Sequence, residues 1–358
     1  MLVGGFATRL RPLSCTRPKT LFPIVNKPLL EWIFERIAKN NIEEAILAAN
    51  GLTAFYVKQK RITKHGLRIK YSVDPPKTPL GTGGPIKKAE KLIGNSETFM
   101  VLNGDIFADL SYIEILKKHE ERGNLATIAL HEVKDPSRYG VAKLDKDCRV
   151  KNFIEKPAEG TAPTNLINAG IYVQSPKIFQ YLPKGKKVSM EREVFPKLAQ
   201  EGQLYGHVFQ GLWMDIGKPK EYLQANKKLL GALAKTQEPK NADNFELRNP
   251  VAIPKGVNIG AKSIIGPYTV IGRNVAVGKN VHISQSVVLS NTKIDDSATI
   301  NEAIIGENAT IGKNVRISKG CIIGDQAKIR DNITLAKETS VCPAKEVSEN
   351  ILKSKIIC

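Results

Sequence analysis

Cysteine is scarce in this sequence. The 358 residues include five cysteines, Cys15, Cys148, Cys321, Cys342 and Cys358. Their number is odd, their spacing is wide, and no Cys-X-X-Cys pair or Cys/His cluster occurs. The sequence therefore indicates neither a disulfide framework nor a zinc site.

Long apolar runs are also lacking. No stretch approaches the roughly 18 uninterrupted apolar residues of a membrane-spanning helix, and Met1-Leu2-Val3 is too short for the apolar core of a signal peptide. We therefore expect a cytoplasmic protein with no membrane partner. With 42% hydrophobic and 25% charged residues, the composition is that of an ordinary globular protein, and the chain is long enough for two domains with their own cores.

A concentrated basic segment is missing as well, although the net charge is +19. Residues 251–358 carry 14 Lys and Arg against 9 Asp and Glu, and residues 1–250 carry 40 against 26, so the excess is spread over the whole chain. Without a basic tail or a Lys/Arg block, we expect no nucleic-acid partner. A diffuse positive field suits substrates that carry phosphates.

The last third of the chain has a repeat. Apolar residues recur at every sixth position, with two five-residue steps, at Ile253, Ile259, Ile265, Ile271, Val277, Ile283, Leu289, Ile294, Ile300, Ile305, Ile311, Ile317, Ile323, Ile329 and Leu335. Such hexapeptides are typical of a parallel β-helix, in which three repeats make one coil, so about five coils are expected. We assign residues 250–338 to this β-helix, 339–358 to a C-terminal cap and the polar segment 232–249 to a linker.

Hexapeptide domains can also be acyltransferases. That chemistry needs a general base, and the only histidine among the repeats is His282. We therefore disfavour the acyltransferase interpretation.

Residues 1–231 are predicted to form an α/β domain. A helix opening at Pro28, strands at 45–49 and 67–71, a short helix after residue 85 and a buried strand at 99–102 follow one another. Met1-Leu2-Val3 is expected to be the end of a first strand that runs into the Gly4-Gly5 loop. Ligands of open α/β sheets bind beyond the carboxyl ends of the strands, and Asp105 lies there, after the strand at 99–102.

The first nineteen residues combine glycine and positive charge. Gly4 and Gly5 let the backbone approach a phosphate closely. Four cations follow within eleven residues, Arg9, Arg11, Arg17 and Lys19, and a guanidinium can bind two phosphate oxygens. The glycines alone would equally fit a tight turn, but together with the cations they predict a loop that holds a nucleoside triphosphate.

The run GGxxTRLRPL is followed by a Pro-Lys pair whose Lys19 lies ten residues after Arg9. Together they resemble the signature of the sugar-1-phosphate nucleotidylyltransferases. The resemblance extends over nearly the whole chain, and further matching runs are LGTGGP at 80–85, VLNGD at 101–105, RYGV at 138–141, EKP at 155–157, INAG at 167–170, EVFP at 193–196 and WMDIG at 213–217. Within that family the sequence is most similar to mannose-1-phosphate guanylyltransferase of the catalytic β-subunit type.

The resemblance implies a Rossmann-like domain with a mixed, mostly parallel sheet, followed by a left-handed β-helix. It also implies that GTP and mannose 1-phosphate are converted to GDP-mannose and pyrophosphate with Mg²⁺ as cofactor. By the same resemblance Arg9 contacts the leaving pyrophosphate, Lys19 contacts the triphosphate, and Asp105 with Asp215 binds the metal. Arg9, Lys19 and Asp105 are thus the expected catalytic residues.

The resemblance also implies two sets of binding residues. Glu191 and Glu193 both precede an apolar helix, and which of them reaches the sugar stays open; Glu191 is taken as the candidate. The expected nucleotide-binding residues are Gly4, Gly5, Thr8, Gly81, Thr82 and Asn103. The expected sugar-phosphate-binding residues are Gly140, Glu155, Lys156, Asn168 and Glu191.

Two alternatives stay open at this point. One is a glucose- or glucosamine-1-phosphate uridylyl- or thymidylyltransferase, because base choice depends on loop shape that the sequence does not show. The other is a non-catalytic regulatory or scaffold subunit of the same superfamily, against which the joint presence of Arg9, Lys19, Asp105, Lys156 and Asp215 argues. Because a β-helix has a long flat flank and open ends, we also expect a homo-oligomer through that domain.

Overall fold

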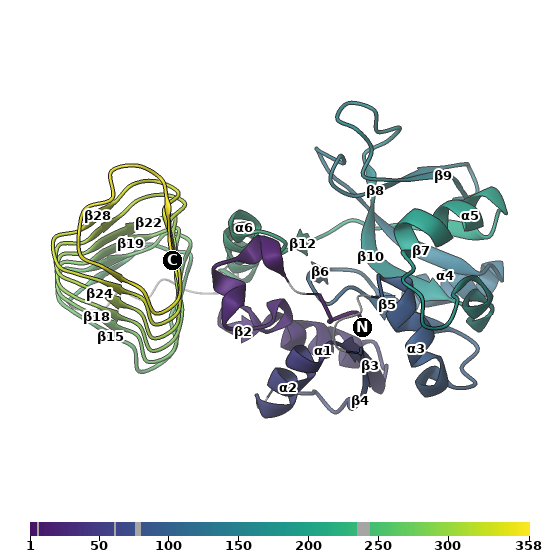
Figure 1. Ribbon diagram of the computed structural model, residues 1–358, viewed down its shortest axis with the longest axis horizontal. Helices are drawn as coiled ribbons and strands as arrows, with labels where there is room; N and C mark the ends of the chain where they lie inside the picture. The colour runs from purple at the N-terminus through teal and green to yellow at the C-terminus, as the bar shows by residue number, and fades with distance from the viewer. Residues whose placement is uncertain (6, 61, 76–79, 235–243) are drawn as a thin grey trace. The chain divides into compact units, whose positions relative to one another are not determined.

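The computed structural model describes residues 1–5, 7–60, 62–75, 80–234 and 244–358. They fall into two units, and both are drawn in Figure 1. Unit 1 comprises Met1–Gly5 and Leu29–Met214, and unit 2 comprises Phe6–Pro28 and Asp215–Cys358. These units do not coincide with the domains expected from the sequence, whose boundaries stay a prediction.

Helix α1 (Leu29–Lys39) forms because its apolar residues recur at spacings of three and four, which places them on one face. Its buried residues include Leu30, Ile33, Phe34 and Ile37, as predicted for the helix that opens at Pro28. The other helical segments of unit 1 are α2 (Gly51–Gln59), α3 (Gly83–Ile93), α4 (Tyr112–Arg122), η4 (Pro176–Tyr181), η5 (Met190–Val194) and α5 (Phe195–Gln200).

The six-stranded sheet of unit 1 is mixed, as predicted, but most of its strand pairs are antiparallel rather than parallel. Strands β3 and β4 are parallel, and Leu2 bridges in parallel to Ala48 of β3 and to Asn103 after β5. Strand β10 runs antiparallel to both β5 and β7, whereas β11 is parallel to β7. The strands are β3 (Glu44–Ala49), β4 (Arg68–Val73), β5 (Phe99–Leu102), β6 (Ile106–Ala108), β7 (Ala126–Glu132), β8 (Gly140–Leu144), β9 (Val150–Glu155), β10 (Leu166–Gln174), β11 (Leu204–Val208) and β12 (Trp213–Asp215).

The prediction for residues 99–102 needs one correction. The continuous apolar run indicates a strand between parallel neighbours, but β5 has an antiparallel neighbour, β10, on one side. Phe99 and Met100 are only half-buried, whereas Val101 and Leu102 are buried. An apolar run shows that a strand is buried, and it says little about the direction of its neighbours.

In unit 2 the N-terminal segment packs against helix α6 (Pro219–Ala234). The segment contains three short 3-10 helices and a two-stranded ribbon. The buried Tyr222 of α6 donates a hydrogen bond to the carbonyl of Pro23 (2.6 Å), and its ring meets Phe22 edge to face. The elements are η1 (Thr8–Leu10), η2 (Leu13–Cys15), η3 (Lys19–Leu21), β1 (Pro23–Ile24) and β2 (Lys27–Pro28).

The rest of unit 2 is the predicted parallel β-helix (Figure 1). Its short strands, from β13 (Glu246–Leu247) to β31 (Ile356–Ile357), form three parallel sheets of six, seven and six strands. About six coils are therefore present where five were expected. The difference arises because pairing begins before residue 250 and continues through 339–358, the segment predicted as a cap. Half of the predicted linker, residues 235–243, lies outside the described residues, whereas residues 232–234 belong to α6 and residues 246–247 to β13.

The strand register locates the five-residue steps of the repeat. Ile271 pairs with Val288, which in turn pairs with Ile305, so these two offsets are 17 residues instead of 18. The inward position of this coil is thus Val288 rather than Leu289, the residue that the six-residue count indicates. Both residues are apolar and buried. Periodicity alone therefore leaves their register open, and pairing with the neighbouring coils decides it.

Cys342 and Cys358 are joined by a disulfide, with Cα atoms 4.9 Å apart. The prediction that no disulfide is present is therefore wrong for this pair. The two residues follow β29 (Ser340–Val341) and β31, which are paired neighbours, so one coil brings together cysteines that are 16 residues apart in sequence.

Within the described part of the chain, no helix has both the length and the apolar character needed to cross a membrane.

The fold generates one prediction about pH. His119 of α4 is 3% exposed and contacts Thr127 Oγ1 through Nδ1 (2.9 Å), and burial lowers its pKa to about 4. Between that value and the ordinary pKa of about 6.5, the unfolded chain binds a proton that the folded chain does not, so stability falls as the pH drops through this window.

We expect His119 to account for a loss of about 2 kcal/mol in the free energy of unfolding between pH 7 and pH 5. Urea denaturation of wild type and His119→Gln at both pH values measures this contribution. The variant should lose less stability on acidification than wild type does. His65→Gln, which removes an exposed imidazole, is the control; equal pH dependence in wild type and His119→Gln would contradict the prediction.

Candidate functional site

The glycine loop lies next to the start of α2. Asn50 Nδ2 donates to the carbonyl of Gly4 (2.8 Å), and a Cβ on Gly4 would lie 3.2 Å from the backbone nitrogen of Asn50. A Cβ on Gly5 would meet nothing within 4 Å, and Gly5 is exposed. The first glycine is therefore explained by packing, and the second leaves the backbone accessible to a ligand.

The signature residues after the glycines belong to unit 2. Thr8 and Arg9 lie exposed on η1, and Arg11 is also exposed. Lys19 is buried at the start of η3, and its Nζ lies 3.3 Å from Asp215 Oδ1. The structure thus brings together two predicted site residues that are 196 positions apart.

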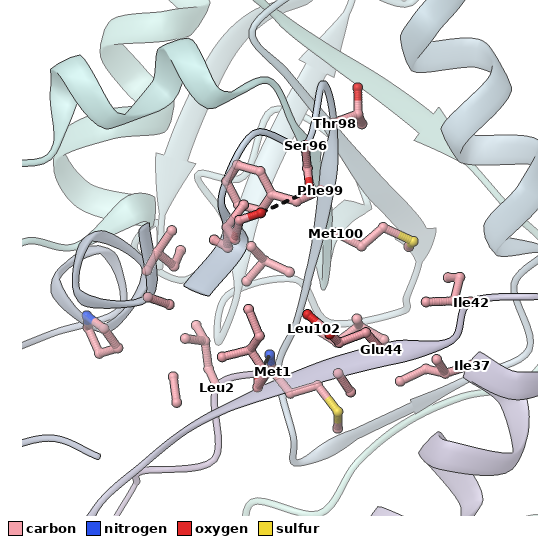
Figure 2. A pocket seen from close by; sticks show the side chains of 18 of the residues that line it. Met1, Leu2, Ile37, Ile42, Glu44, Ser96, Thr98, Phe99, Met100 and Leu102 are labelled. Carbon is pink, nitrogen blue, oxygen red and sulfur yellow. Dashed lines mark hydrogen bonds between the residues drawn. The ribbon is translucent and has the colours of Figure 1, made fainter. Parts of the chain in front are cut away.

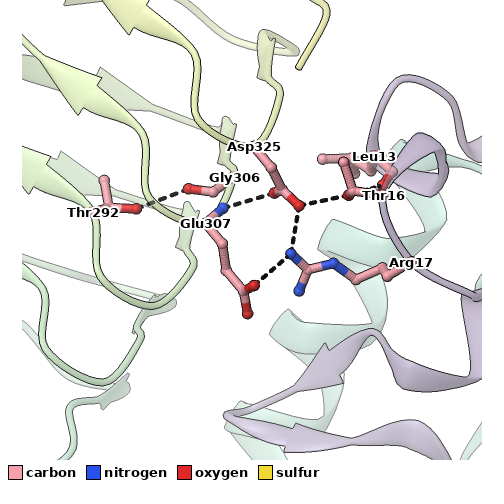
Figure 3. A network of polar contacts seen from close by, with 7 residues as sticks. All are labelled: Leu13, Thr16, Arg17, Thr292, Gly306, Glu307 and Asp325. Atoms are coloured by element: carbon pink, nitrogen blue, oxygen red, sulfur yellow. Dashed lines mark hydrogen bonds and ion pairs between the residues drawn. The ribbon is translucent and has the colours of Figure 1, made fainter. Parts of the chain in front are cut away.

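Arg17 departs from the prediction. It was counted among four cations around the phosphates, but its guanidinium is paired with Glu307 and Asp325 of the β-helix (Figure 3). A guanidinium that forms two ion pairs is already neutralised. We therefore remove Arg17 from the candidate phosphate ligands.

A second group of polar residues lies in unit 1, around a bulge in β10. Between Asn168 and Tyr172 the register with β7 shifts, and Gly170 adopts φ +75°, which favours glycine. Asn168 Oδ1 accepts from the Gly170 amide (3.0 Å), and the Gly170 carbonyl accepts from the Asn103 amide (2.9 Å). A Cβ on Gly170 would lie 2.8 Å from Asn103 Nδ2. The bulge therefore brings Asn103 next to Asn168.

Tyr172 connects this bulge to Glu191. Its ring is fully buried, and its hydroxyl accepts from Asn168 Nδ2 (3.1 Å) and donates to Glu191 Oε1 (3.3 Å). Glu191 Oε2 accepts from Thr82 Oγ1 (2.7 Å). Burial and the Glu191 carboxylate raise the pKa of Tyr172 well above its usual value, so the phenol stays protonated and can donate.

The glutamate that reaches this group is Glu191. Glu193 is exposed, and its Oε1 accepts from the Ser189 amide (2.8 Å) at the start of η5. The two residues belong to a single π-helical turn, on which positions two apart do not share a face. The geometry therefore places only Glu191 beside Tyr172.

Glu155 and Lys156 end β9 near the same group. A Cβ on Gly140 would lie 2.5 Å from Phe153 Cζ and 2.9 Å from Glu155 Oε2, so a side chain at this position would displace both. Burial and Glu191 raise the pKa of Glu155, although the Lys156 ammonium, whose Nζ is 3.6 Å from Oε1, acts in the opposite direction. Two neighbouring acids and an exposed ammonium can bind a ligand that has hydroxyls and a phosphate.

Thr82 follows a second constrained glycine. Gly81 has φ +72°, and a Cβ there would lie 2.2 Å from the Val188 carbonyl. This close approach brings the turn before α3 against the segment before η5, where the Met190 amide donates to Thr82 Oγ1 (2.9 Å). Thr82 therefore bridges the second glycine loop and Glu191.

The predicted metal ligands lie in different units. Asp105 is half-buried between β5 and β6 in unit 1, two residues after Asn103, and Asp215 is half-buried at the end of β12 in unit 2. Their approach to one another stays a prediction. Among the described residues no group of three or more His, Cys, Asp or Glu side chains could hold a metal.

Tyr172 is the residue of this group that the sequence reasoning missed. Asn168, Gly170 and Tyr172 occupy alternate positions, which on a regular strand share one face. The first two were identified from the INAG run, and the third lies just beyond it. The tyrosine could have been found by continuing the alternation.

A separate cavity of about 390 Å³ lies elsewhere in unit 1. Figure 2 shows it lined mostly by apolar side chains, among them Leu2, Ile37, Phe99 and Leu102, from α1, β5 and the chain start. None of the predicted site residues lines it. The polar groups described above, rather than this apolar cavity, are therefore the candidate site.

Comparisons with known proteins show which family the chain belongs to. Residues 1–231 match the family model of the nucleotidyl transferases, and residues 247–357 match a model described as the GMPPB C-terminal domain. A solved structure, HddC from Yersinia pseudotuberculosis complexed with GMP-PN, is 32% identical with a TM-score of 0.54, and the match covers 64% of this chain and 97% of HddC.

Curated relatives extend the likeness. The mannose-1-phosphate guanylyltransferase catalytic subunit beta of Danio rerio is 41% identical over 225 residues, which are 62% of each chain. The mannose-1-phosphate guanyltransferase of Aspergillus oryzae is 37% identical over 251 residues, 69% of this chain and 68% of that protein. The chain thus matches somewhat under two thirds of the length of the Danio rerio relative. With the family model matched over residues 1–231, the chain belongs to the nucleotidyl transferase family.

Proposed function

We propose that this protein transfers a guanylyl group from GTP to mannose 1-phosphate, giving GDP-mannose and pyrophosphate in the cytoplasm. The observation that carries the proposal is the hydrogen-bonded group of the buried Asn168 and Tyr172 with the half-buried Thr82 and Glu191, beside Glu155 and Lys156. It offers acceptors for sugar hydroxyls next to a cation for the sugar phosphate. The names of the curated relatives support the choice of mannose 1-phosphate and guanine.

The reaction needs no nucleophilic side chain. An anionic oxygen of the sugar phosphate attacks the α-phosphorus of GTP, a new P–O bond forms, and the bond to the β-phosphate oxygen breaks. Its electron pair leaves with pyrophosphate. Catalysis then consists of holding the two phosphates in line and stabilising the charge on the leaving group.

Different residues bind the sugar, its phosphate and the phosphates of GTP. Glu191 and Glu155 accept hydrogen bonds from sugar hydroxyls, and Lys156 binds the sugar phosphate as a point charge. Arg9 is exposed and a guanidinium can bind two oxygens, so it suits the leaving pyrophosphate. Lys19 binds the triphosphate from its buried position beside Asp215.

Asp105 and Asp215 fit a magnesium ion. Mg²⁺ takes one or two carboxylates and completes its shell with phosphate oxygens and water, so it does not need a cluster of three protein ligands. When bound, Mg²⁺ neutralises part of the triphosphate charge. Asp215 is held by Lys19 before any metal arrives, which offsets the repulsion between its carboxylate and a triphosphate. The homo-oligomer expected through the β-helix stays a prediction.

The first prediction concerns substrates. In a panel of GTP, ATP, UTP and dTTP against mannose, glucose and glucosamine 1-phosphates with Mg²⁺, pyrophosphate release should be fastest for GTP with mannose 1-phosphate. A preference for UTP or dTTP would overturn the guanine assignment. No turnover with any pair would favour a regulatory or scaffold subunit.

The second prediction concerns the metal ligands. Asp105→Asn and Asp215→Asn should each lower kcat by about two or more orders of magnitude, with a smaller loss in GTP binding, because the metal acts mainly on charge in the transition state. Steady-state kinetics and melting temperatures of both variants are the measurement. Asp147→Asn, an exposed carboxylate in a turn, is the control. Near-normal turnover in either variant would show that its carboxylate is not a required ligand.

The third prediction concerns Tyr172. Tyr172→Phe keeps the ring that packs against Phe195 but removes the hydroxyl that holds Asn168 and Glu191. A hydrogen bond to a charged group contributes about 1.5–3 kcal/mol, so we expect the KM for mannose 1-phosphate to rise about tenfold or more, with an unchanged KM for GTP.

Tyr181→Phe is the matched control for that variant, because the Tyr181 hydroxyl donates to a carboxylate, that of Glu201, away from the site (2.5 Å). If both tyrosine variants have the same KM for mannose 1-phosphate as wild type, Tyr172 does not position the sugar group.

A further inference from the structure

Arg17 is held by the β-helix although it belongs to the signature loop. Its side chain is 5% exposed, and Nη2 lies 2.6 Å from Asp325 Oδ2 and 2.8 Å from Glu307 Oε2 (Figure 3). Burial lowers the pKa of Arg17, but the two carboxylates outweigh burial and raise it. The guanidinium therefore stays charged and in place.

The two carboxylates come from neighbouring coils. Glu307 follows Gly306 and Asp325 follows Gly324, 18 residues or one coil later. The Glu307 amide donates to Asp325 Oδ1 (2.7 Å), so one Asp325 oxygen connects two coils. Acidic side chains stacked in this way repel each other unless a cation lies between them, and Arg17 supplies that cation.

The other Asp325 oxygen contacts the loop twice. Oδ2 accepts from Arg17 Nη2 and from Thr16 Oγ1 (both 2.6 Å). Because Thr16 and Arg17 are adjacent, one carboxylate oxygen fixes both the backbone position and the side-chain direction of this turn.

Hydrogen bonds within residues 7–22 connect the turn that Asp325 holds to Arg9 on one side and to Lys19 on the other. Ser14 Oγ donates to the carbonyl of Ala7 (2.8 Å), which fixes the turn that carries Arg9. On the other side, the Phe22 amide donates to the carbonyl of Lys19 (3.1 Å), and Arg17 lies 5.6 Å from the centre of the Phe22 ring. The turn held by Asp325 thus lies between the two cations proposed to bind the triphosphate.

We propose that Asp325 and Glu307 are positioning residues for nucleotide binding, which act through Arg17 and Thr16. The β-helix is then part of the catalytic apparatus, because its two stacked carboxylates hold residues 7–22 in the conformation that presents Arg9 and Lys19. The functional half of this inference, the effect on nucleotide binding, rests on the proposed function. The structural half, that the two carboxylates hold the conformation of residues 7–22, does not depend on it.

Hydrogen–deuterium exchange on the full chain tests the structural half. Asp325→Asn keeps the Oδ1 acceptor for the Glu307 amide but removes the charge opposite Arg17. Its matched control is Asp331→Asn, since Asp331 is exposed and its Oδ1 accepts from the Lys313 amide (2.8 Å), the equivalent bond between coils. Amides of residues 7–22 should exchange at least fivefold faster in Asp325→Asn and at the wild-type rate in Asp331→Asn. Equal exchange in the two variants would overturn the proposal, whether or not the wild type turns over.

Kinetics test the functional half. Asp325→Asn should raise the KM for GTP about tenfold and leave the KM for mannose 1-phosphate within twofold, because the sugar group belongs to unit 1. A lower kcat with both KM values unchanged would indicate only fewer folded molecules and would overturn positioning.

Adding Arg17→Gln to Asp325→Asn should raise the KM for GTP little further if the two residues act as a pair; additive effects would overturn that pairing. Absence of wild-type turnover would reject the proposed function, and the exchange result would then decide the structural half alone.

Discussion

The bulge in β10 is the constraint on which the polar group around Tyr172 depends. This strand runs antiparallel to both β5 and β7, and its register shifts between Asn168 and Tyr172. Three backbone groups of the bulge have partners nearby: the Gly170 amide bonds to Asn168, the Gly170 carbonyl to Asn103, and the Ala169 carbonyl to Trp213 Nε1 (3.1 Å). Because buried backbone groups must be satisfied, the irregular strand is held rigidly and can serve as a binding surface.

Three of the cations discussed above each lie close to a carboxylate. Lys19, Arg17 and Lys156 each lie beside a carboxylate, at distances from 2.6 to 3.6 Å. For Lys19 and Lys156 the partner lies in a predicted site, and a phosphate can compete for the cation. Arg17 is different, since it is shared by two carboxylates in a nearly dry environment, where removing one partner costs more than the pair contributes. A chain with a net charge of +19 can therefore use one of its cations to hold the loop and still present others to an anionic ligand.

The β-helix supports this arrangement through its regularity. Coils of 16 to 18 residues place residues from successive turns above one another, so Glu307 and Asp325 form a stacked acidic pair and Cys342 reaches Cys358. Neither the acidic pair nor the disulfide corresponds to a short sequence motif. Each follows from the coil length, which the apolar hexapeptides set.

The sequence by itself determined the α/β class of the N-terminal part and the repeat domain, since apolar periods of 2, 3.6 and 6 are local patterns, and its resemblance to a known family supplied the mixed sheet and the candidate site residues. Only the tertiary structure decided which residues meet across the chain. It gave Arg17 its partner Asp325, 308 residues away, placed Glu191 rather than Glu193 beside Tyr172, set Val288 rather than Leu289 in the stacked core, and paired Cys342 with Cys358. The physical reason is that local spacing limits the face on which a side chain lies, whereas its partner depends on strand register and coil length summed over the intervening chain.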